Sequence, residues 1–335
     1  MTRWQQRLDL FAADHAADSS NSDDDPDILF LVNPASAGGK PMEPYADCLA
    51  ELKATGRHVE VYISRNSDDI IGLSKTKDLS SYKAIAVLSG DSTLYELVQD
   101  PLRENNGRWP YDAPILMLPG GSVNVIATEN FGAKALPRQI IRQTLNAASN
   151  NALVKKASVM HVSSETATSR YILHHGAGGI SGKVLAYMEG RRADIYPTLG
   201  NIGMLFTLLF HLPFVSTNDI AGPVFFDVWN SDIEAGKDMG FGVRRFDSNM
   251  TVVTIPKDKY PGKIEIIRLL PKLISGAIAK SWKEGNAPEY LSIEKTNKHA
   301  HQVDSTRTAE GAVTTIYGDG SGKVPFVSSD AKITV

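Results

Sequence analysis

Three glycine-bearing turns in the N-terminal part of the chain carry the residues best suited to chemistry. Each follows a short apolar run, and they read LVNPASAGGK (Leu31 to Lys40), VLSGDSTLYE (Val87 to Glu96) and MLPGGSVNV (Met117 to Val125). A glycine turn that opens a helix presents free backbone N–H groups to an anion. Three such turns at one edge of a parallel sheet would form a phosphate-binding rim, so they predict a nucleotide site.

The second turn contains a carboxylate, Asp91. Because a carboxylate repels phosphate unless a metal ion or a transferable proton intervenes, Asp91 predicts magnesium coordination or activation of a hydroxyl group. A structural interpretation stands beside this one, since Thr93 to Glu96 fits a capping box with Asp91 and Ser92 as ordinary helix-start residues. In the third turn, Ser122 could likewise cap the helix that follows.

The first and third turns also offer phosphate contacts. Asn33, Ser36 and the neighbouring glycine amides are expected to hold phosphate oxygens, with Lys40 adding positive charge. The spacing G-x-x-x-x-G-K-[ST] of a Walker A loop is missing, and a plain strand-to-helix turn is the alternative. In the third turn, the adjacent glycines Gly120 and Gly121 indicate a close approach of backbone to ligand.

The turns must be positioned by the segments around them. Helical patterning in Tyr45–Ala54 and Thr93–Asp100 separates apolar runs that predict strands at Ile28–Val32, His58–Ile63, Lys83–Leu88 and Ala113–Leu118. Strands that alternate with helices indicate βαβ units and a parallel sheet, which binds ligands at the carboxyl ends of its strands.

After residue 150 the pattern changes to strands mostly without helices between them. The expected strands are Leu153–Val162, Arg170–His174, Val224–Trp229, Met250–Ile255, Lys263–Arg268 and Thr314–Tyr317. This pattern predicts an antiparallel β-rich domain. With the polar run at 146–151 as boundary, we expect a disordered acidic tail over residues 1–26, an α/β nucleotide-binding domain over 27–150 and a β-rich lipid-binding domain over 151–335.

One apolar run in the second half, Leu199 to Val215, carries no charged residue. It is too short, and too interrupted by glycine and proline, for a membrane span. We favour a buried core helix over the alternative, an apolar lid that admits an acyl chain or touches a membrane surface.

Composition excludes several classes of protein. A formal charge of −3 without a basic stripe speaks against a nucleic-acid partner. The single cysteine, Cys48, excludes an internal disulfide framework and indicates a reducing, cytoplasmic setting. The N-terminus lacks the apolar core of a signal peptide. The histidine pairs at 174–175 and 299/301 lack partner ligands at recognisable spacing, so no zinc site is expected.

The three turns, in this order and spacing, resemble the catalytic domain shared by diacylglycerol kinases, sphingosine kinases and bacterial lipid kinases. That family carries an N-P-x-S-G-type turn, a G-G-D-G-T turn and a P-x-G-[ST]-x-N turn. The matching segments here are Asn33 to Ser36, Gly90 to Thr93 and Pro119 to Asn124. More weakly, His175 to Ile180 resembles a strand that leads into a glycine turn and helix, and Tyr317 to Ser321 resembles the late D-G-E element.

The resemblance implies an α/β nucleotide domain and a sandwich-like lipid domain, with ATP in the cleft between them. It implies transfer of the ATP γ-phosphoryl group, with Mg²⁺, to a lipid hydroxyl of a diacylglycerol or long-chain base presented at a membrane surface. Asp91 and Asp319 are the implied catalytic and metal residues. The implied nucleotide-binding residues are Asn33, Pro34, Ser36, Ser64, Ser89, Gly90, Ser92, Thr93, Glu96, Gly121, Ser122, Asn124 and Gly320, and Arg191 and Arg192 are further candidates for phosphate contacts.

The chain departs from the family pattern at several positions. Ser89 and Ser92 replace glycines of the G-G-D-G-T turn, and Ser321 replaces the D-G-E glutamate. The segment from Gly179 to Lys183 lacks the carboxylate with which sphingosine kinases bind the substrate amine, which makes sphingosine the less supported substrate. The alternative is therefore a catalytically weak or inactive kinase-like protein that binds nucleotide or lipid. A kinase for a soluble metabolite such as NAD would share the turn architecture.

Overall fold

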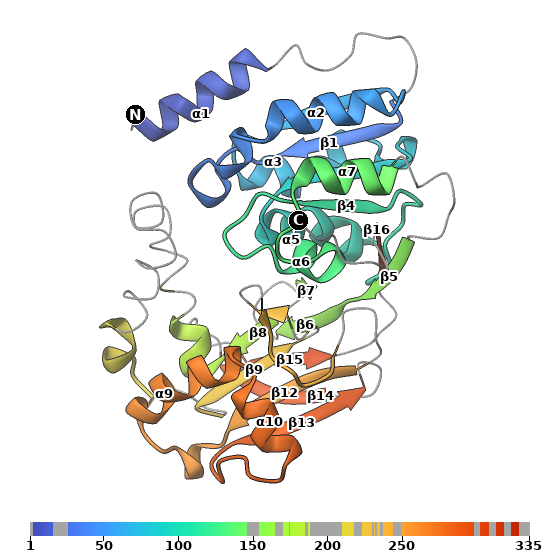
Figure 1. The fold of residues 1–335 in the computed structure, drawn as a ribbon. Helices are drawn as coiled ribbons and strands as arrows, with labels where there is room; N and C mark the ends of the chain where they lie inside the picture. The colour runs from blue at the N-terminus through green and yellow to red at the C-terminus, as the bar shows by residue number, and fades with distance from the viewer. Residues whose placement is uncertain are drawn as a thin grey trace. The chain divides into compact units, whose positions relative to one another are not determined.

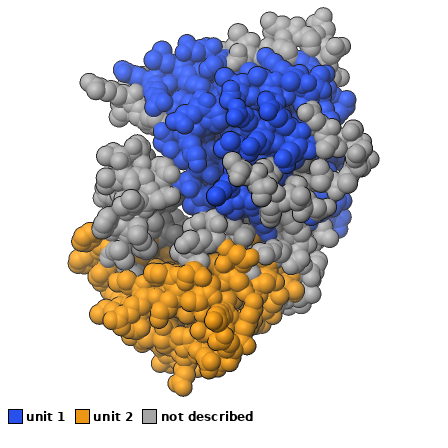
Figure 2. All heavy atoms as spheres, in the orientation of Figure 1, with its two compact units in different colours: residues 1–157, 323–335 blue, residues 158–322 orange. Residues whose placement is uncertain are grey.

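The computed structural model describes residues 3–15, 26–145, 154–164, 170–173, 175–184, 187, 210–217, 223–229, 231, 233–234, 237–243, 249–297, 302–307, 313–317 and 323–327. The chain divides into two compact units, which Figure 2 shows in different colours. One comprises residues 1–157 and 323–335, and the other comprises residues 158–322.

The first unit is built on a six-stranded sheet in the order β2-β1-β3-β4-β16-β5. The strands are β1 (Ile28–Val32), β2 (Val59–Ile63), β3 (Ala84–Ser89), β4 (Ile115–Pro119), β5 (Val154–Ser158) and β16 (Lys323–Val327). Pairing is parallel from β2 through β1, β3 and β4 to β16. Because β5 and the C-terminal β16 extend this sheet, the division of the chain differs from the expected domains at 27–150 and 151–335.

Both faces of this sheet are covered by helices. The strands β1, β3 and β4 are apolar apart from Ser89 at the end of β3, as expected for a parallel sheet buried on two sides. On one face, Phe30 and Leu118 pack with Cys48, Phe131 and Ile141. These residues come from α2 (Tyr45–Ala54), α6 (Val125–Phe131) and α7 (Pro137–Leu145), and α2 and α7 lie side by side in Figure 1.

The opposite face is covered by α5 (Asp91–Glu104), which contacts β3 and the short helices α3 (Ser67–Ile71) and α4 (Leu73–Thr76). Its residues Leu94, Leu97 and Leu102 are buried. Short 3₁₀ turns lie at η1 (Ser36–Gly38), η2 (Lys40–Met42) and η3 (Leu79–Ser81).

The N-terminal residues contain a helix, α1 (Arg3–Asp14), within the segment expected to be an acidic tail. Leu8 is buried, and the Phe11 ring lies 5.2 Å from that of Tyr45 in α2. Leu8 and Ala12 lie one helical turn apart on one face, and Phe11 lies at the edge of that face, which gives the segment apolar surface to pack on the first unit. The acidic run at 16–25 lies outside the described residues.

The second unit is antiparallel and β-rich, which confirms the expected fold class. One sheet has the order β13-β12-β9-β8 and another has the order β14-β15-β6-β7, with a small pair β10-β11. The strands are β6 (Met160–Ser164), β7 (Arg170–Ile172), β8 (His175–Gly178), β9 (Phe225–Trp229), β10 (Ile233–Glu234), β11 (Lys237–Asp238), β12 (Asn249–Ile255), β13 (Ser292–Asn297), β14 (Gln302–Arg307) and β15 (Val313–Tyr317). The helical segments are residues 179–184, η5 (Leu212–Phe214), η6 (Lys257–Lys259), α9 (Lys263–Ile274) and α10 (Ala277–Lys283).

The prediction of a strand at Lys263–Arg268 is wrong, because this segment begins helix α9. Its first residues alternate polar and apolar, which is typical of a strand. The longer spacing decides the structure, since Ile266, Leu269 and Leu273 are buried in the unit's core whereas Ile264 is 67% exposed. Burial at intervals of three and four residues is the pattern of an amphipathic helix.

Among the described residues, no helix has both the length and the apolar character needed to cross a membrane. Most of the apolar run from Leu199 lies outside them. Its described end differs from the buried core helix that we favoured, because Phe210 and Phe214 are 71% and 82% exposed. Pro213 lies in the short 3₁₀ turn η5 between them, and proline does not support the interior of an α-helix.

Candidate nucleotide-binding site

The three glycine turns lie on neighbouring strands of the first unit. The strand β3 pairs in parallel with β1 on one side and β4 on the other, and the turns follow the carboxyl ends of these strands. This arrangement confirms that the turns share one edge of a parallel sheet, the edge where such sheets bind ligands.

The second and third turns touch through their glycines. A Cβ atom added to Gly121 would lie 2.4 Å from the Cα of Gly90, and one added to Gly90 would lie 3.0 Å from Ser36 Oγ of the first turn. A Cβ added to Gly120 would lie 3.0 Å from the backbone nitrogen of Ser89. Glycine is required here because backbone packs on backbone.

A buried hydroxyl joins the first turn to the second. Thr93 Oγ1 accepts a hydrogen bond from Asn33 Nδ2 (2.9 Å) and another from Ser89 Oγ (2.6 Å). Asn33 Oδ1 also accepts from the backbone N–H of Ala35 (3.1 Å). Thr93 and Ser89 are fully buried. The side chain that distinguishes Ser89 from the family's glycine is therefore turned into the protein.

The helix after the second turn starts two residues earlier than predicted. Helix α5 begins at Asp91, with Gly90 as its N-cap residue, so the proposed capping box of Thr93 and Glu96 is wrong. The side chain of Thr93 instead binds Asn33 and Ser89 inside the fold. The first N–H groups of α5, from Asp91 and Ser92, have no intrahelical acceptor and lie at the positive end of the helix dipole.

Asp91 holds the third turn in place. Its Oδ2 accepts from the backbone N–H of Val125 (2.8 Å), and its Oδ1 accepts from that of Ile126 (3.0 Å). These are first-turn amides of α6, so Asp91 rather than Ser122 supplies the side-chain cap of this helix. Each carboxylate oxygen keeps a further lone pair for another partner.

Asn124 closes the third turn upon itself. Its backbone is left-handed (φ 53°), a conformation that asparagine tolerates better than most residues. Its Oδ1 accepts from Gly121 N–H (2.6 Å) and its Nδ2 donates to the Gly121 carbonyl oxygen (2.9 Å). Lys40 Nζ donates to the same carbonyl oxygen (3.3 Å), which links the first turn to the third and places a cation beside them.

Ser64 lies at the carboxyl end of β2, where it is buried and its N–H donates to the Val32 carbonyl oxygen (2.9 Å). It lines a cavity of about 290 Å³ together with Pro34 and Ala35 of the first turn. Arg65 and four residues of α1 complete the lining: Leu8, Asp9, Ala12 and Ala13. Neither Arg65 nor α1 was predicted from the sequence, although the apolar spacing of Leu8 and Ala12 was a usable signal.

The predicted site residues fall into three groups. The structure brings together Asn33, Ser36, Ser89, Gly90, Asp91, Thr93, Gly121 and Asn124 through the contacts above. Pro34 and Ser64 lie on the neighbouring cavity, Ser92 and Glu96 lie on α5 and Ser122 lies in the third turn. Asp319, Gly320, Arg191 and Arg192 lie outside the described residues. Within the part that is described, no three His, Cys, Asp or Glu side chains are grouped so that they could hold a metal ion.

Residues 27–162 match the family model of the diacylglycerol kinase catalytic domain. This segment is similar to the catalytic domain of diacylglycerol kinases. The matched segment contains all three turns, so the family resemblance is confirmed on the residues that first indicated it. No curated protein matches this diacylglycerol kinase-like chain at a significant level of sequence similarity.

Three solved structures from Bacillus anthracis str. Sterne share the fold. All three are named as diacylglycerol kinases, two of them provisionally. The first has a TM-score of 0.57 at 14% identity, covering 94% of this chain and 99% of its own. The second has a TM-score of 0.56 at 14% identity, with 92% and 99% covered. Because the sequence identity is low, these similarities establish only the fold of the chain.

Proposed function

We propose that this chain is an ATP-dependent lipid kinase that transfers the γ-phosphoryl group to a lipid hydroxyl, on a diacylglycerol-like lipid or a long-chain base. The observation that carries the proposal is the contact of Ser36, Gly90 and Gly121 at one sheet edge, within a segment that matches the diacylglycerol kinase catalytic domain. Backbone amides and a helix N-terminus gathered in this way are suited to a polyphosphate.

In this proposal the phosphates lie against the N-terminus of α5 and the third turn. The amides of Asp91 and Ser92, the hydroxyl groups of Ser36 and Ser122 and the ammonium group of Lys40 would contact phosphate oxygens. Phosphoryl transfer depends mainly on positioning and on neutralising charge, and these groups supply both.

Asp91 fits a role beside a magnesium ion, because its carboxylate is held by two amides and still has lone pairs available. Magnesium is commonly bound by one or two carboxylates together with substrate phosphates, and it would neutralise charge on the transferred group. Asp319 is the second carboxylate of the proposal.

The proposed reaction forms a bond between the lipid hydroxyl oxygen and the γ-phosphorus. The bond from that phosphorus to the β–γ bridging oxygen breaks, ADP leaves, and the hydroxyl proton passes to a base. Asp91 and Asp319 are the proposed carboxylates for this proton transfer, a contribution that is typically about 10²–10⁴-fold.

We further propose that the second unit meets its lipid at a membrane surface, as a cytoplasmic protein that associates peripherally. Phe210, Phe214 and Ile264 are large apolar residues that are 71%, 82% and 67% exposed. Lys263 Nζ donates to the Pro213 carbonyl oxygen (2.6 Å), which ties the turn η5 to the start of α9. Exposed aromatic residues beside lysines are typical of segments that bind anionic lipid surfaces.

The test is transfer of radiolabelled γ-phosphate from ATP to a panel of lipids in vesicles, beside a titration of nucleotide binding. Labelled diacylglycerol or long-chain base phosphate supports the kinase. Nucleotide binding without transfer to any lipid would instead support the inactive, kinase-like alternative, which Ser321 in place of the D-G-E glutamate favours. The absence of both binding and transfer would overturn the proposal.

A further inference from the structure

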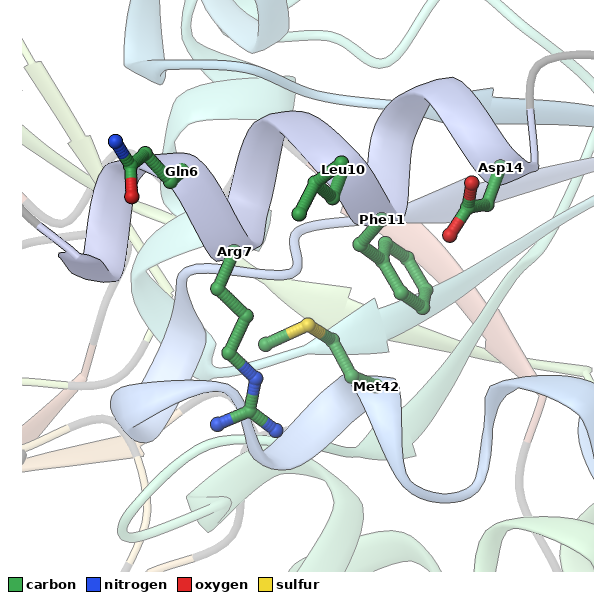
Figure 3. Close-up of a pocket in the computed structure, with 6 residues that line it drawn as sticks. All are labelled: Gln6, Arg7, Leu10, Phe11, Asp14 and Met42. Atoms are coloured by element: carbon green, nitrogen blue, oxygen red, sulfur yellow. The ribbon is translucent and has the colours of Figure 1, made fainter.

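Helix α1 has two faces that each line a hollow in the first unit. Leu8, Asp9, Ala12 and Ala13 line the cavity of about 290 Å³ beside the first turn. On the other face, Gln6, Arg7, Leu10, Phe11 and Asp14 line a second hollow together with Met42, shown in Figure 3. The helix therefore separates two hollows, and only one of them contains residues of the glycine turns.

Aromatic contacts hold α1 on this unit. The rings of Phe11 and His15 lie 5.2 Å and 4.5 Å from the ring of Tyr45, which is itself buried against Phe30 in β1. Leu8 is 8% exposed. These contacts fix the helix close to the carboxyl end of β1, where the first turn begins.

The first turn is shared by the phosphate site and the cavity. Ser36 is packed against Gly90 on the side of the three converging turns. Pro34 and Ala35, the two residues before it, line the cavity under α1. If the phosphates of a ligand bind to the turns, the group attached to those phosphates would therefore lie in the cavity.

We infer that α1 forms one wall of the nucleotide site and encloses the nucleoside part of the bound nucleotide. This inference rests on the proposed function. The cavity volume of about 290 Å³ lies just below the range for ligand pockets, about 300–1,000 Å³, which fits a nucleoside better than a complete triphosphate.

The chemistry of the lining agrees with a nucleoside. Leu8, Ala12 and Pro34 provide apolar surface for a planar base, as in most small-molecule sites. Asp9, Ser64 and Arg65 provide polar groups suited to ribose hydroxyls and ring nitrogens. Because α1 contributes to both sets, nucleotide binding and the docking of α1 stabilise each other.

The test compares two tryptophan substitutions on α1 in the full chain, Ala13→Trp and Leu10→Trp. Both positions are exposed, but Ala13 lines the cavity and Leu10 lines the hollow on the other face. The binding of ATP and of inorganic tripolyphosphate is measured for each. We expect Ala13→Trp to weaken ATP binding by about tenfold or more and to leave tripolyphosphate binding unchanged. The control Leu10→Trp should change neither.

The outcomes separate the two proposals. If the unmodified chain binds neither ATP nor tripolyphosphate, the proposed function fails. If it binds ATP and Ala13→Trp binds ATP equally well, or loses ATP and tripolyphosphate together, the role of α1 is wrong and the proposed function stands. Hydrogen exchange tests the role of α1 in the unmodified chain, since ATP but not tripolyphosphate should slow amide exchange across residues 8–15. Equal exchange with and without ATP would overturn the inference.

Discussion

Gly90 and Gly121 meet at the edge of the sheet so closely that a Cβ atom on Gly121 would lie 2.4 Å from the Cα of Gly90. We therefore expect Gly121→Ala to push the third turn away from the second. The substitution should lower stability by about 1–3 kcal/mol, as overpacking does, and abolish ATP binding. Thermal unfolding and an ATP titration measure these two effects.

The matched control is Gly72→Ala, between α3 and α4, where φ is −78° and the added Cβ would lie 3.3 Å from one carbonyl oxygen. It should leave ATP affinity unchanged. Normal ATP affinity in Gly121→Ala would show that the contact between the turns does not form the nucleotide site.

Asp91→Asn should eliminate phosphate transfer to lipid without unfolding the chain. Asparagine keeps one acceptor oxygen for the amides of Val125 and Ile126, so one hydrogen bond at the start of α6 is lost and the other is no longer charge-assisted. Loss of such a bond costs about 1.5–3 kcal/mol. Transfer of labelled phosphate and urea unfolding are measured together.

Asp78→Asn is the control for this loss, because Asp78 Oδ1 accepts from Ser80 N–H (2.9 Å) in η3, a turn that contributes nothing to the site. It should be destabilised yet retain full transfer activity. Full activity in Asp91→Asn would remove Asp91 from the proposed mechanism.

Ser89→Gly restores the family residue in the second turn, but we expect no gain in nucleotide binding. The Ser89 hydroxyl is buried and donates to Thr93 Oγ1, so it does not obstruct phosphate. The variant should lose about 0.5–1.5 kcal/mol from this hydrogen bond while its ATP affinity stays the same. A marked rise in ATP affinity would show that the Ser89 side chain faces the ligand.

Cys48 makes the stability of the chain sensitive to alkaline pH. Burial, assisted by Asp47 and Glu51, raises the pKa of the Cys48 thiol to about 12. An unfolded thiol has a pKa of about 8.5, so above this pH the unfolded state loses its proton first and is favoured. Stability contributed by the neutral thiol should therefore be complete below about pH 8.5 and fall progressively up to about pH 12.

Urea unfolding between pH 8 and pH 10 tests this behaviour, with Cys48→Ala as the comparison. Cys48→Ala should have a lower free energy of unfolding at every pH in this range, but that free energy should fall less steeply as the pH rises. The native thiol should also resist a disulfide reagent until the chain unfolds. Identical pH slopes for the two proteins would contradict the assignment to Cys48.

Phe214→Ser should weaken binding to vesicles that contain anionic lipid. Phe214 is 82% exposed, so its loss removes membrane-binding surface with little effect on folding. Co-sedimentation with vesicles measures the effect, and ATP binding in solution should not change. Leu136→Ser, at an exposed apolar position (43%) in the first unit, is the control. Unaltered sedimentation of Phe214→Ser would rule out η5 as the contact.

The sequence predicted that the three turns share one edge of the sheet, because the signals for this arrangement are local. Runs such as Ile28–Val32 are buried strands, and glycine pairs between strand and helix mark positions where backbone meets backbone. Alternation of strands and helices then placed the turns at one edge. The bounds of α2 were also predicted as observed, Tyr45–Ala54.

Features that depend on distant partners could not be predicted in this way. Asp91 caps a helix that starts 34 residues later, and Thr93 binds Asn33 across 60 positions, so both side chains had local interpretations that were incomplete. In α9, a short alternation of polar and apolar residues concealed the helical spacing of Ile266, Leu269 and Leu273. Helix α1 is stabilised by Tyr45, which its own sequence does not reveal.

The most direct test of the central claim is amide NMR of the isotope-labelled chain during addition of ATP with Mg²⁺. If the three turns bind one polyphosphate, the amide signals of residues 36–40, 90–93 and 120–124 should shift together with a single dissociation constant. Inorganic tripolyphosphate should reproduce these shifts. Shifts confined to one turn, or different dissociation constants for different turns, would contradict the account.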